Sequence, residues 1–276
     1  MATGLGGLPD LDPNYDVPGD AKNQFQEKGW TKLENVCTTD EVAAYREIIK
    51  DTAVRHVNED RPLEERDTYG KAFLQVTNLW QKDERVAKFV LAKRFAKIAA
   101  DLMGVEGVRL YHDQALFKEP GGGHTPWHQD QYYWPLEGVK TVTMWMPLVD
   151  VDKSMMAMKF AENSHHDGSL VQLEISDESE EFFNNLVKEK GYNVEQVEAM
   201  GAGDATWHTG WTLHAAPGNA TERMREVMTI IYYEDGAEIS EPDSEARKLD
   251  LKTWFPGQKP GEKAGSPINP LLYSRG

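Results

Sequence analysis

Hydrophobic and polar positions in the second half of the chain fall into short runs that are typical of β-strands. Residues 139–149 are a clear example, in which Thr141, Thr143 and Trp145 share one face because side chains two apart in a strand point the same way. Residues 225–234 are rich in β-branched and aromatic side chains and predict the last strong strand. Further short strands are expected over 108–118, 155–160, 169–174, 194–199, 204–208 and 211–216.

The first half of the chain has helical spacing instead. Apolar side chains three and four residues apart predict an amphipathic helix that runs to about residue 56, with Thr39 as its N-cap. Residues 85–103 predict a second helix, which ends at Gly104. A shorter helix, a stop at Gly29 and a strand are expected over 24–35, and another strand over 73–80.

These elements predict a mainly β fold with helical cover. Many short strands, with helices mostly before them, favour a closed or nearly closed β core that can hold a ligand in its mouth. We expect a flexible leader over 1–20 and a single domain over 21–276, with a barrel core at about 107–235 and a polar tail over 236–276. The acidic helix expected over 176–191 and the tail are the two candidates for a lid.

Composition and charge argue against several classes of function. The 276 residues carry a net charge of −16, which disfavours nucleic acid and, more weakly, large polyanionic substrates. No apolar run approaches the ~20 residues of a membrane helix. The single cysteine, Cys37, excludes an internal disulfide and favours a reducing, cytoplasmic setting. The expected partner is a small-molecule substrate, and the oligomeric state stays open.

A His-x-Asp triplet, His128 and Asp130, is the strongest chemical signal. In extended backbone these two side chains lie on one face, so an imidazole and a carboxylate project side by side. They are two of the three ligands of a 2-His-1-carboxylate Fe(II) site. A histidine on a later strand is needed as the third ligand, and either His214 or His208 can supply it.

Five stretches of the chain resemble the phytanoyl-CoA dioxygenase-like family of Fe(II)/2-oxoglutarate oxygenases. They are 24–45, 120–134, 141–150, 160–164 and 203–233. The resemblance covers most of the chain and implies a double-stranded β-helix, the jelly-roll barrel of cupin-like enzymes. It also implies an enzyme that consumes dioxygen and 2-oxoglutarate, oxidises a C–H bond of a small molecule, and releases succinate and CO2.

The resemblance implies a role for each matching residue. Fe(II) would bind His128, Asp130 and His214. Arg225 would pair with the distal carboxylate of 2-oxoglutarate, because a guanidinium holds a carboxylate through two parallel hydrogen bonds; Arg223 is the alternative anchor. The remaining expected pocket residues are Trp145 and Gln114 for the cosubstrate, and Gln75, Tyr132, Trp134 and Trp211 for the substrate.

Two departures from the family pattern bear on the pocket. Ala216 stands where family members commonly carry a serine, and residues 156–165 replace a Gly-rich segment. Two other functions stay open beside the main one: a cupin-like metal dioxygenase that does not use 2-oxoglutarate, and a non-catalytic barrel that binds small molecules. A halogenase is disfavoured, because halogenases of this type lack the metal carboxylate and Asp130 is present.

Overall fold

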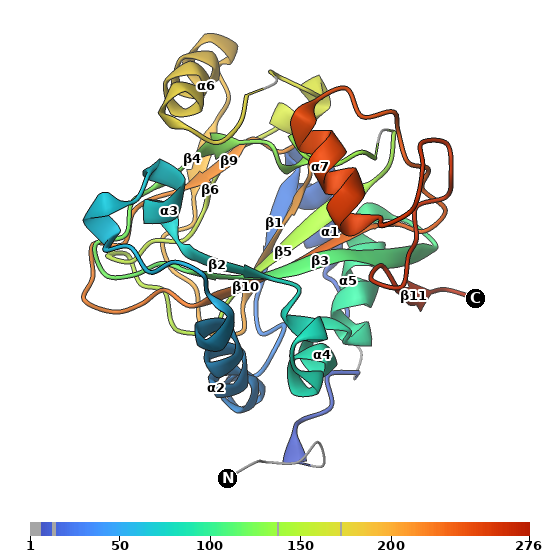
Figure 1. Ribbon diagram of the computed structural model, residues 1–276, viewed down its shortest axis with the longest axis horizontal. Coiled ribbons are helices and arrows are strands. Elements are labelled where there is room, and N and C mark those ends of the chain that lie inside the picture. The colour runs from blue at the N-terminus through green and yellow to red at the C-terminus, as the bar shows by residue number, and fades with distance from the viewer. Residues whose placement is uncertain (1–6, 13–14, 137, 172) are drawn as a thin grey trace.

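The computed structural model describes residues 7–12, 15–136, 138–171 and 173–276. Within these ranges the strands form two antiparallel sheets (Figure 1). The major sheet has the order β1-β8-β5-β10-β3-β11, and β2 also pairs with β3; the minor sheet has the order β4-β9-β6-β7. The major strands are β1 (Trp30–Leu33), β2 (Leu74–Thr77), β3 (Gly107–Phe117), β5 (Thr141–Pro147), β8 (Ala205–Thr209), β10 (Val227–Glu234) and β11 (Leu271–Ser274). The minor strands are β4 (Thr125–His128), β6 (Lys159–Ala161), β7 (Val194–Gln196) and β9 (His214–Ala216).

Helices cover the outer face of the major sheet, as Figure 1 shows for α2, α4 and α5. The α-helices are α1 (Gly19–Lys28), α2 (Thr39–His56), α3 (Thr68–Ala72), α4 (Glu84–Val90), α5 (Lys93–Met103), α6 (Asp177–Lys190) and α7 (Glu245–Trp254). Short 3-10 turns are η2 (Leu63–Glu65), η3 (Leu79–Gln81), η4 (Asp130–Tyr132) and η5 (Ser164–Asp167). The mainly β fold with helical cover is therefore confirmed, although the two sheets stay separate within the described ranges.

Strand β5 shows how alternation divides the molecule into a core and a site. Val142, Met144 and Met146 belong to the main apolar core under the helices. Thr143 and Trp145, on the opposite face, line a cavity between the sheets. Because successive side chains of a strand point to opposite faces, one strand serves both purposes.

Several boundaries differ from the expectations. The helix expected over 85–103 is two helices, α4 and α5, separated at Leu91 and Ala92. The N-cap of α2 is Thr38 rather than Thr39, because the Thr38 hydroxyl accepts the Glu41 backbone N–H and the Glu41 carboxylate accepts the Thr38 N–H in return. The described part of 169–174 forms no strand.

The two ends of the chain contribute more than expected. Leu11 and Val17, within the expected leader, are buried in the main core. The expected tail contains α7 and β11, and β11 extends the major sheet beside β3. Strands β1 and β2 precede the expected barrel core and also belong to the major sheet. None of the helices in the described ranges is both long enough and apolar enough to cross a membrane.

Candidate metal centre

Two paired strands bring the distant histidines together. Strand β4 pairs with β9 in a register that places His128 opposite His214. Asp130 lies just beyond the end of β4 and begins the turn η4, so the triplet is not wholly within a strand as expected. The intervening Gln129 is extended, with φ −116° and ψ 122°, which keeps His128 and Asp130 on one side.

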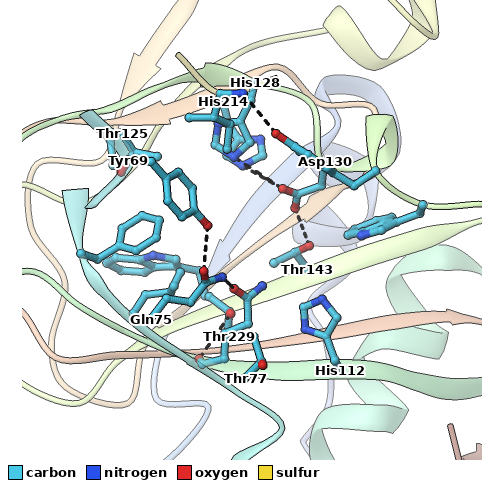
Figure 2. Close-up of a pocket in the computed structure, with 18 of the residues that line it drawn as sticks. Tyr69, Gln75, Thr77, His112, Thr125, His128, Asp130, Thr143, His214 and Thr229 are labelled. Atoms are coloured by element: carbon cyan, nitrogen blue, oxygen red, sulfur yellow. Dashed lines mark hydrogen bonds and ion pairs between the residues drawn. The ribbon is translucent and has the colours of Figure 1, made fainter. Parts of the chain in front are cut away.

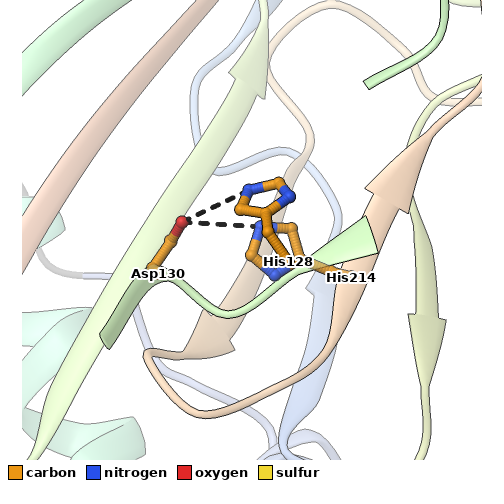
Figure 3. Close-up of side chains that lie close together, drawn as sticks. All are labelled: His128, Asp130 and His214. Atoms are coloured by element: carbon orange, nitrogen blue, oxygen red, sulfur yellow. Dashed lines mark ion pairs between the residues drawn. The ribbon is translucent and has the colours of Figure 1, made fainter. Parts of the chain in front are cut away.

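The three side chains converge on one point (Figure 3). Their ligand atoms all lie within 4.8 Å of one another. Nε2 of His128 is 3.5 Å from Oδ1 of Asp130, and Nε2 of His214 is 3.6 Å from the same oxygen. Two imidazoles and one carboxylate form the donor set of a facial Fe(II) site, so these residues fit that metal.

Backbone carbonyls orient both imidazoles. Nδ1 of His128 lies 2.8 Å from the carbonyl of Pro126, and Nδ1 of His214 lies 2.8 Å from the carbonyl of Thr212. Since a carbonyl can only accept, each Nδ1 carries the proton and donates. Each Nε2 is then left with a free lone pair that points toward the other ligands, which is the arrangement of metal-binding histidines.

The electrostatics of the cluster also suit a metal. Burial, together with the neighbouring His128 and His208, holds the pKa of His214 well below its usual range, so this imidazole is neutral. Burial alone would raise the pKa of Asp130, but the surrounding histidines outweigh it and hold that pKa well below its usual range. A neutral imidazole and an ionised carboxylate are the forms that bind metals.

His208 occupies the position of a supporting residue. Its Nε2 lies 3.3 Å from Oδ2 of Asp130, whereas His128 and His214 are closest to Oδ1. Thr143 donates a hydrogen bond of 2.8 Å to the same Oδ2. The geometry therefore favours His214 as the third ligand and gives His208 a contact with the other side of the carboxylate.

A cavity of about 560 Å³ opens beside the three residues (Figure 2). It is lined by residues from both sheets and from α7. Figure 2 shows Thr143, His112 and Asp130 projecting into the same space as Tyr69 and Gln75. The expected residues that line the cavity are His128, Asp130, His214, Arg225, Trp145, Gln114, Gln75 and Trp134.

Arg225 is the clearest cosubstrate candidate. Its side chain is buried. The only described hydrogen bond of that side chain joins Nη1 to the carbonyl of Met156 at 2.7 Å, while Nε has no partner among the described residues. No described carboxylate lies within ion-pair distance of it. Burial lowers its pKa to about 10, so it still carries its charge at neutral pH. Arg223 is half exposed and already bonded to Asp152 at 2.7 Å, which leaves Arg225 as the anchor that the geometry favours.

A second buried basic residue lies beside Arg225. The backbones of Lys118 and Arg225 are bonded to each other, and the Lys118 side-chain amine donates to the carbonyl of Gly123. Burial, and then repulsion from Arg225, lower the pKa of Lys118 to about 6. A buried region that disfavours additional positive charge is suited to an anionic ligand.

Gln75 and Gln114, named separately from the sequence, contact each other in the structure. Gln75 of β2 donates a hydrogen bond to Gln114 of β3, and Tyr69 donates one of 3.0 Å to Gln75 (Figure 2). The ring of Trp145 lies 5.6 Å from the guanidinium carbon of Arg225. Thr229 of β10 lies opposite Gln114 on one side and opposite Trp145 on the other, which places both residues in the same part of the cavity wall.

Two expected substrate residues lie elsewhere. Neither Tyr132 nor Trp211 is among the described residues that line the cavity. Tyr132 lies in the turn η4, where its ring packs edge-on against Tyr133, and Tyr133 lines the cavity instead. Trp211 lies in the turn between β8 and β9, and its carbonyl accepts a hydrogen bond from Gln129.

Sequence patterns missed two parts of the wall. Tyr69 comes from α3, in a charged stretch of the sequence, and Phe73 is the residue that follows this helix. Leu249, Asp250 and Trp254 come from α7, within the expected tail. The aromatic residues in these polar stretches were the only signal, and an aromatic residue alone does not distinguish packing from a pocket.

The chain matches a known protein family and a curated protein. Residues 25–227 match the model of the family described as Phytanoyl-CoA dioxygenase (PhyH). A "Probable alpha-ketoglutarate-dependent hypophosphite dioxygenase" of Stutzerimonas stutzeri is 24% identical over 150 residues, which are 52% of each chain. The matched segment thus spans about half the length of that curated relative.

Solved structures show the same fold. The carbocyclase SnoK from nogalamycin biosynthesis, described as non-heme and alpha ketoglutarate dependent, has a TM-score of 0.76 at 22% identity and covers 96% of this chain and 99% of its own. The epimerase SnoN in complex with Fe3+, alpha ketoglutarate and nogalamycin RO has a TM-score of 0.74 at 22% identity. That match covers 92% of this chain and 97% of the SnoN chain. EctD from S. alaskensis with 2-oxoglutarate and 5-hydroxyectoine has a TM-score of 0.67 at 15% identity. That match covers 93% of this chain and 91% of the EctD chain. These neighbours have the double-stranded β-helix fold, so that expectation is confirmed.

The family match covers well over half of the chain and includes every residue discussed above as a metal or cosubstrate candidate. It agrees with the convergence of His128, Asp130 and His214 on one point. The chain belongs to the phytanoyl-CoA dioxygenase (PhyH) family.

Proposed function

We propose that this protein is an Fe(II)- and 2-oxoglutarate-dependent dioxygenase that oxidises a C–H bond of a small molecule, with release of succinate and CO2. One observation carries the proposal. A buried arginine without a described carboxylate partner, Arg225, lines the same cavity as a 2-His-1-carboxylate cluster. A buried charge is costly in free energy unless it is paired, so the buried Arg225 favours binding of an anionic ligand in that cavity.

The metal ligands would be Nε2 of His128, Nε2 of His214 and Oδ1 of Asp130. Three protein ligands on one face leave the opposite positions open for other molecules. Fe(II), when bound there, supplies the activation of dioxygen that is coupled to the oxidative decarboxylation of 2-oxoglutarate. Thr143 and His208 hold the second oxygen of Asp130, which keeps the first oxygen directed toward the two histidines.

Arg225 would pair with the distal carboxylate of 2-oxoglutarate. A guanidinium is suited to this role because it offers parallel N–H donors to both oxygens of a carboxylate. The Trp145 ring beside it restricts the space around that carboxylate, and the amide of Gln114 offers further hydrogen bonds. The aromatic side chains of the wall, which include Trp134 and Tyr133, would exclude water from the reacting C–H bond.

The alternative functions are less well supported. A metal dioxygenase that does not use 2-oxoglutarate gives no role to the buried Arg225. A non-catalytic barrel gives no role to the carbonyls that orient His128 and His214. The proposal includes a cytoplasmic location, which is supported by Cys37, a free buried thiol that suits a reducing compartment.

The test is formation of succinate from 2-oxoglutarate by purified protein with Fe(II) and dioxygen, followed by mass spectrometry. We expect slow formation without a prime substrate and none in Asp130→Ala. Enzyme that binds Fe(II) yet forms no succinate with any tested substrate, and does not bind 2-oxoglutarate, would contradict the proposal.

A further inference from the structure

The wall of the cavity contributed by α7 carries a buried carboxylate that the proposed reaction does not use. Asp250 and Trp254 lie one helical turn apart on α7, and both line the cavity. Arg247, on the same helix, donates to the carbonyls of Tyr132 and Gln131, at 3.2 and 3.5 Å. The helix is thus docked against the turn that follows Asp130, so its cavity-facing side chains belong to the same site as the metal ligands.

Asp250 lacks a cation. Its carboxylate accepts a hydrogen bond of 2.7 Å from the Tyr111 hydroxyl, and the Trp254 side chain lies beside it. No lysine or arginine in the described part of the chain lies within ion-pair distance of it. Burial raises the pKa of this carboxyl to about 7, in keeping with the lack of a cation beside it.

A second group beside Asp250 has unused hydrogen-bonding capacity. His112 projects from β3 into the cavity (Figure 2), is only 6% exposed, and its Nδ1 has no partner among the described residues. Its ring packs against Trp254, with 4.4 Å between ring centroids. Burial lowers its pKa to about 3, so it is a neutral imidazole that can accept a hydrogen bond. His112, Trp254 and Asp250 therefore form one continuous wall.

The net charge of the cavity indicates which class of substrate can bind beside this wall. The charges of Fe(II), Asp130, 2-oxoglutarate and Arg225 cancel when all are present. The other described charged residues of the lining are Asp250 and Glu174, both acidic. Aromatic rings line much of the remaining wall, and their faces attract cations. An anionic substrate would meet uncompensated negative charge there.

We propose that the substrate carries a cationic nitrogen, which binds to Asp250 with the Trp254 ring and the His112 imidazole beside it. This inference deepens the proposed function and rests on it, since it assumes that Arg225 is occupied by 2-oxoglutarate. The same charges disfavour phosphorylated and coenzyme A-linked substrates.

Three probes of similar shape test the inference: benzylamine, benzyl alcohol and benzoate. Their binding to the full-length protein, loaded with Fe(II) and 2-oxoglutarate under argon, is measured by calorimetry. Benzylamine is expected to bind about tenfold more tightly than benzyl alcohol, as one charge-assisted hydrogen bond would give. Benzoate is expected to bind more weakly than either. Equal affinity for benzyl alcohol and benzylamine, or a preference for benzoate, would overturn the inference.

Two variants locate the binding site. Asp250→Asn keeps the shape of the side chain and should weaken benzylamine binding about tenfold, with less than a twofold effect on benzyl alcohol. Glu245→Gln removes an exposed acid from the same helix and should change neither affinity. Unchanged benzylamine binding by Asp250→Asn would mean that the amine binds elsewhere, for instance on the metal, and would also overturn the inference.

The two proposals fail in different ways. Binding of 2-oxoglutarate is measured first in the same instrument, and its absence would count against the proposed function alone. Benzylamine and benzyl alcohol are then compared again without Fe(II) and 2-oxoglutarate. A preference for benzylamine that persists there, and is lost in Asp250→Asn, supports the cation site whatever the outcome for the cosubstrate.

Discussion

The hydroxyl of Thr143 donates a hydrogen bond of 2.8 Å to Oδ2 of Asp130, while the histidines His128 and His214 are closest to Oδ1. The two oxygens of one carboxylate are thus given different tasks. His208, at 3.3 Å, contacts the same Oδ2 as Thr143. This leaves Oδ1 as the single oxygen available to a metal. The polar face of β5, through Thr143, therefore helps to orient the carboxylate ligand.

Removing that hydroxyl should weaken metal binding without removing a ligand. Thr143→Val keeps the size of the side chain but leaves Oδ2 with one fewer donor. Because residues that orient metal ligands typically change affinity about 10–100-fold, we expect a loss of Fe(II) affinity of roughly tenfold. Anaerobic titration with Fe(II) measures the change.

A matched control lies on the neighbouring strand β8. Thr206 is fully buried, and its hydroxyl has no hydrogen-bond partner among the described residues. Thr206→Val should leave Fe(II) affinity unchanged. An equal loss in both variants would mean that Thr143 acts through packing rather than through Asp130.

Arg225 and Arg223 offer a second matched pair. Arg225→Met should weaken 2-oxoglutarate binding by about 10–100-fold, because a charge-assisted hydrogen bond contributes ~1.5–3 kcal/mol. Arg223→Met removes an exposed ion pair with Asp152 and should have little effect. Calorimetric titration with 2-oxoglutarate measures both, and the reverse result would move the anchor to Arg223.

The sequence predicted the centre of the site better than its walls. The spacing of His128 and Asp130 is local, so extended backbone alone brings the two side chains to one side. His214 could be named only with the family resemblance, because His208 has the same chemistry and lies six residues earlier. Pairing of β4 with β9 distinguishes the two, and strand pairing is a long-range property that no local pattern contains.

The walls depend on tertiary contacts. The tail from residue 236 onward is polar, yet Arg247 docks α7 onto backbone carbonyls near the metal ligands. A polar contact of this kind leaves no hydrophobic periodicity to detect. Tyr132 and Trp211, which were predicted as pocket residues, lie outside the cavity lining for a related reason, since both occupy turns whose direction depends on their neighbours.

A buried carboxyl in β3 predicts how stability varies with pH. Asp113 accepts backbone hydrogen bonds from Leu79 and Trp80, and burial raises its pKa to about 7. The folded protein therefore holds this proton more tightly than the unfolded chain. Its contribution to stability is present below the ordinary aspartate pKa and is lost as pH rises toward 7.

Asp113→Asn isolates this effect. The free energy of unfolding of the native protein, relative to the variant, should fall by a few kcal/mol between about pH 4 and pH 8, at ~1.4 kcal/mol per pKa unit. Urea unfolding at several pH values measures the difference, in which other titrating groups cancel. A difference that stays constant with pH would show that Asp113 is ionised in the folded protein throughout.

The most direct test of the central claim is anomalous X-ray diffraction at the iron edge, from crystals grown with Fe(II) and 2-oxoglutarate under argon. We predict one strong peak in the cavity, bonded to Nε2 of His128, Nε2 of His214 and Oδ1 of Asp130, with the distal carboxylate of 2-oxoglutarate on Arg225. Iron bound at other residues, or 2-oxoglutarate bound away from Arg225, would contradict the account.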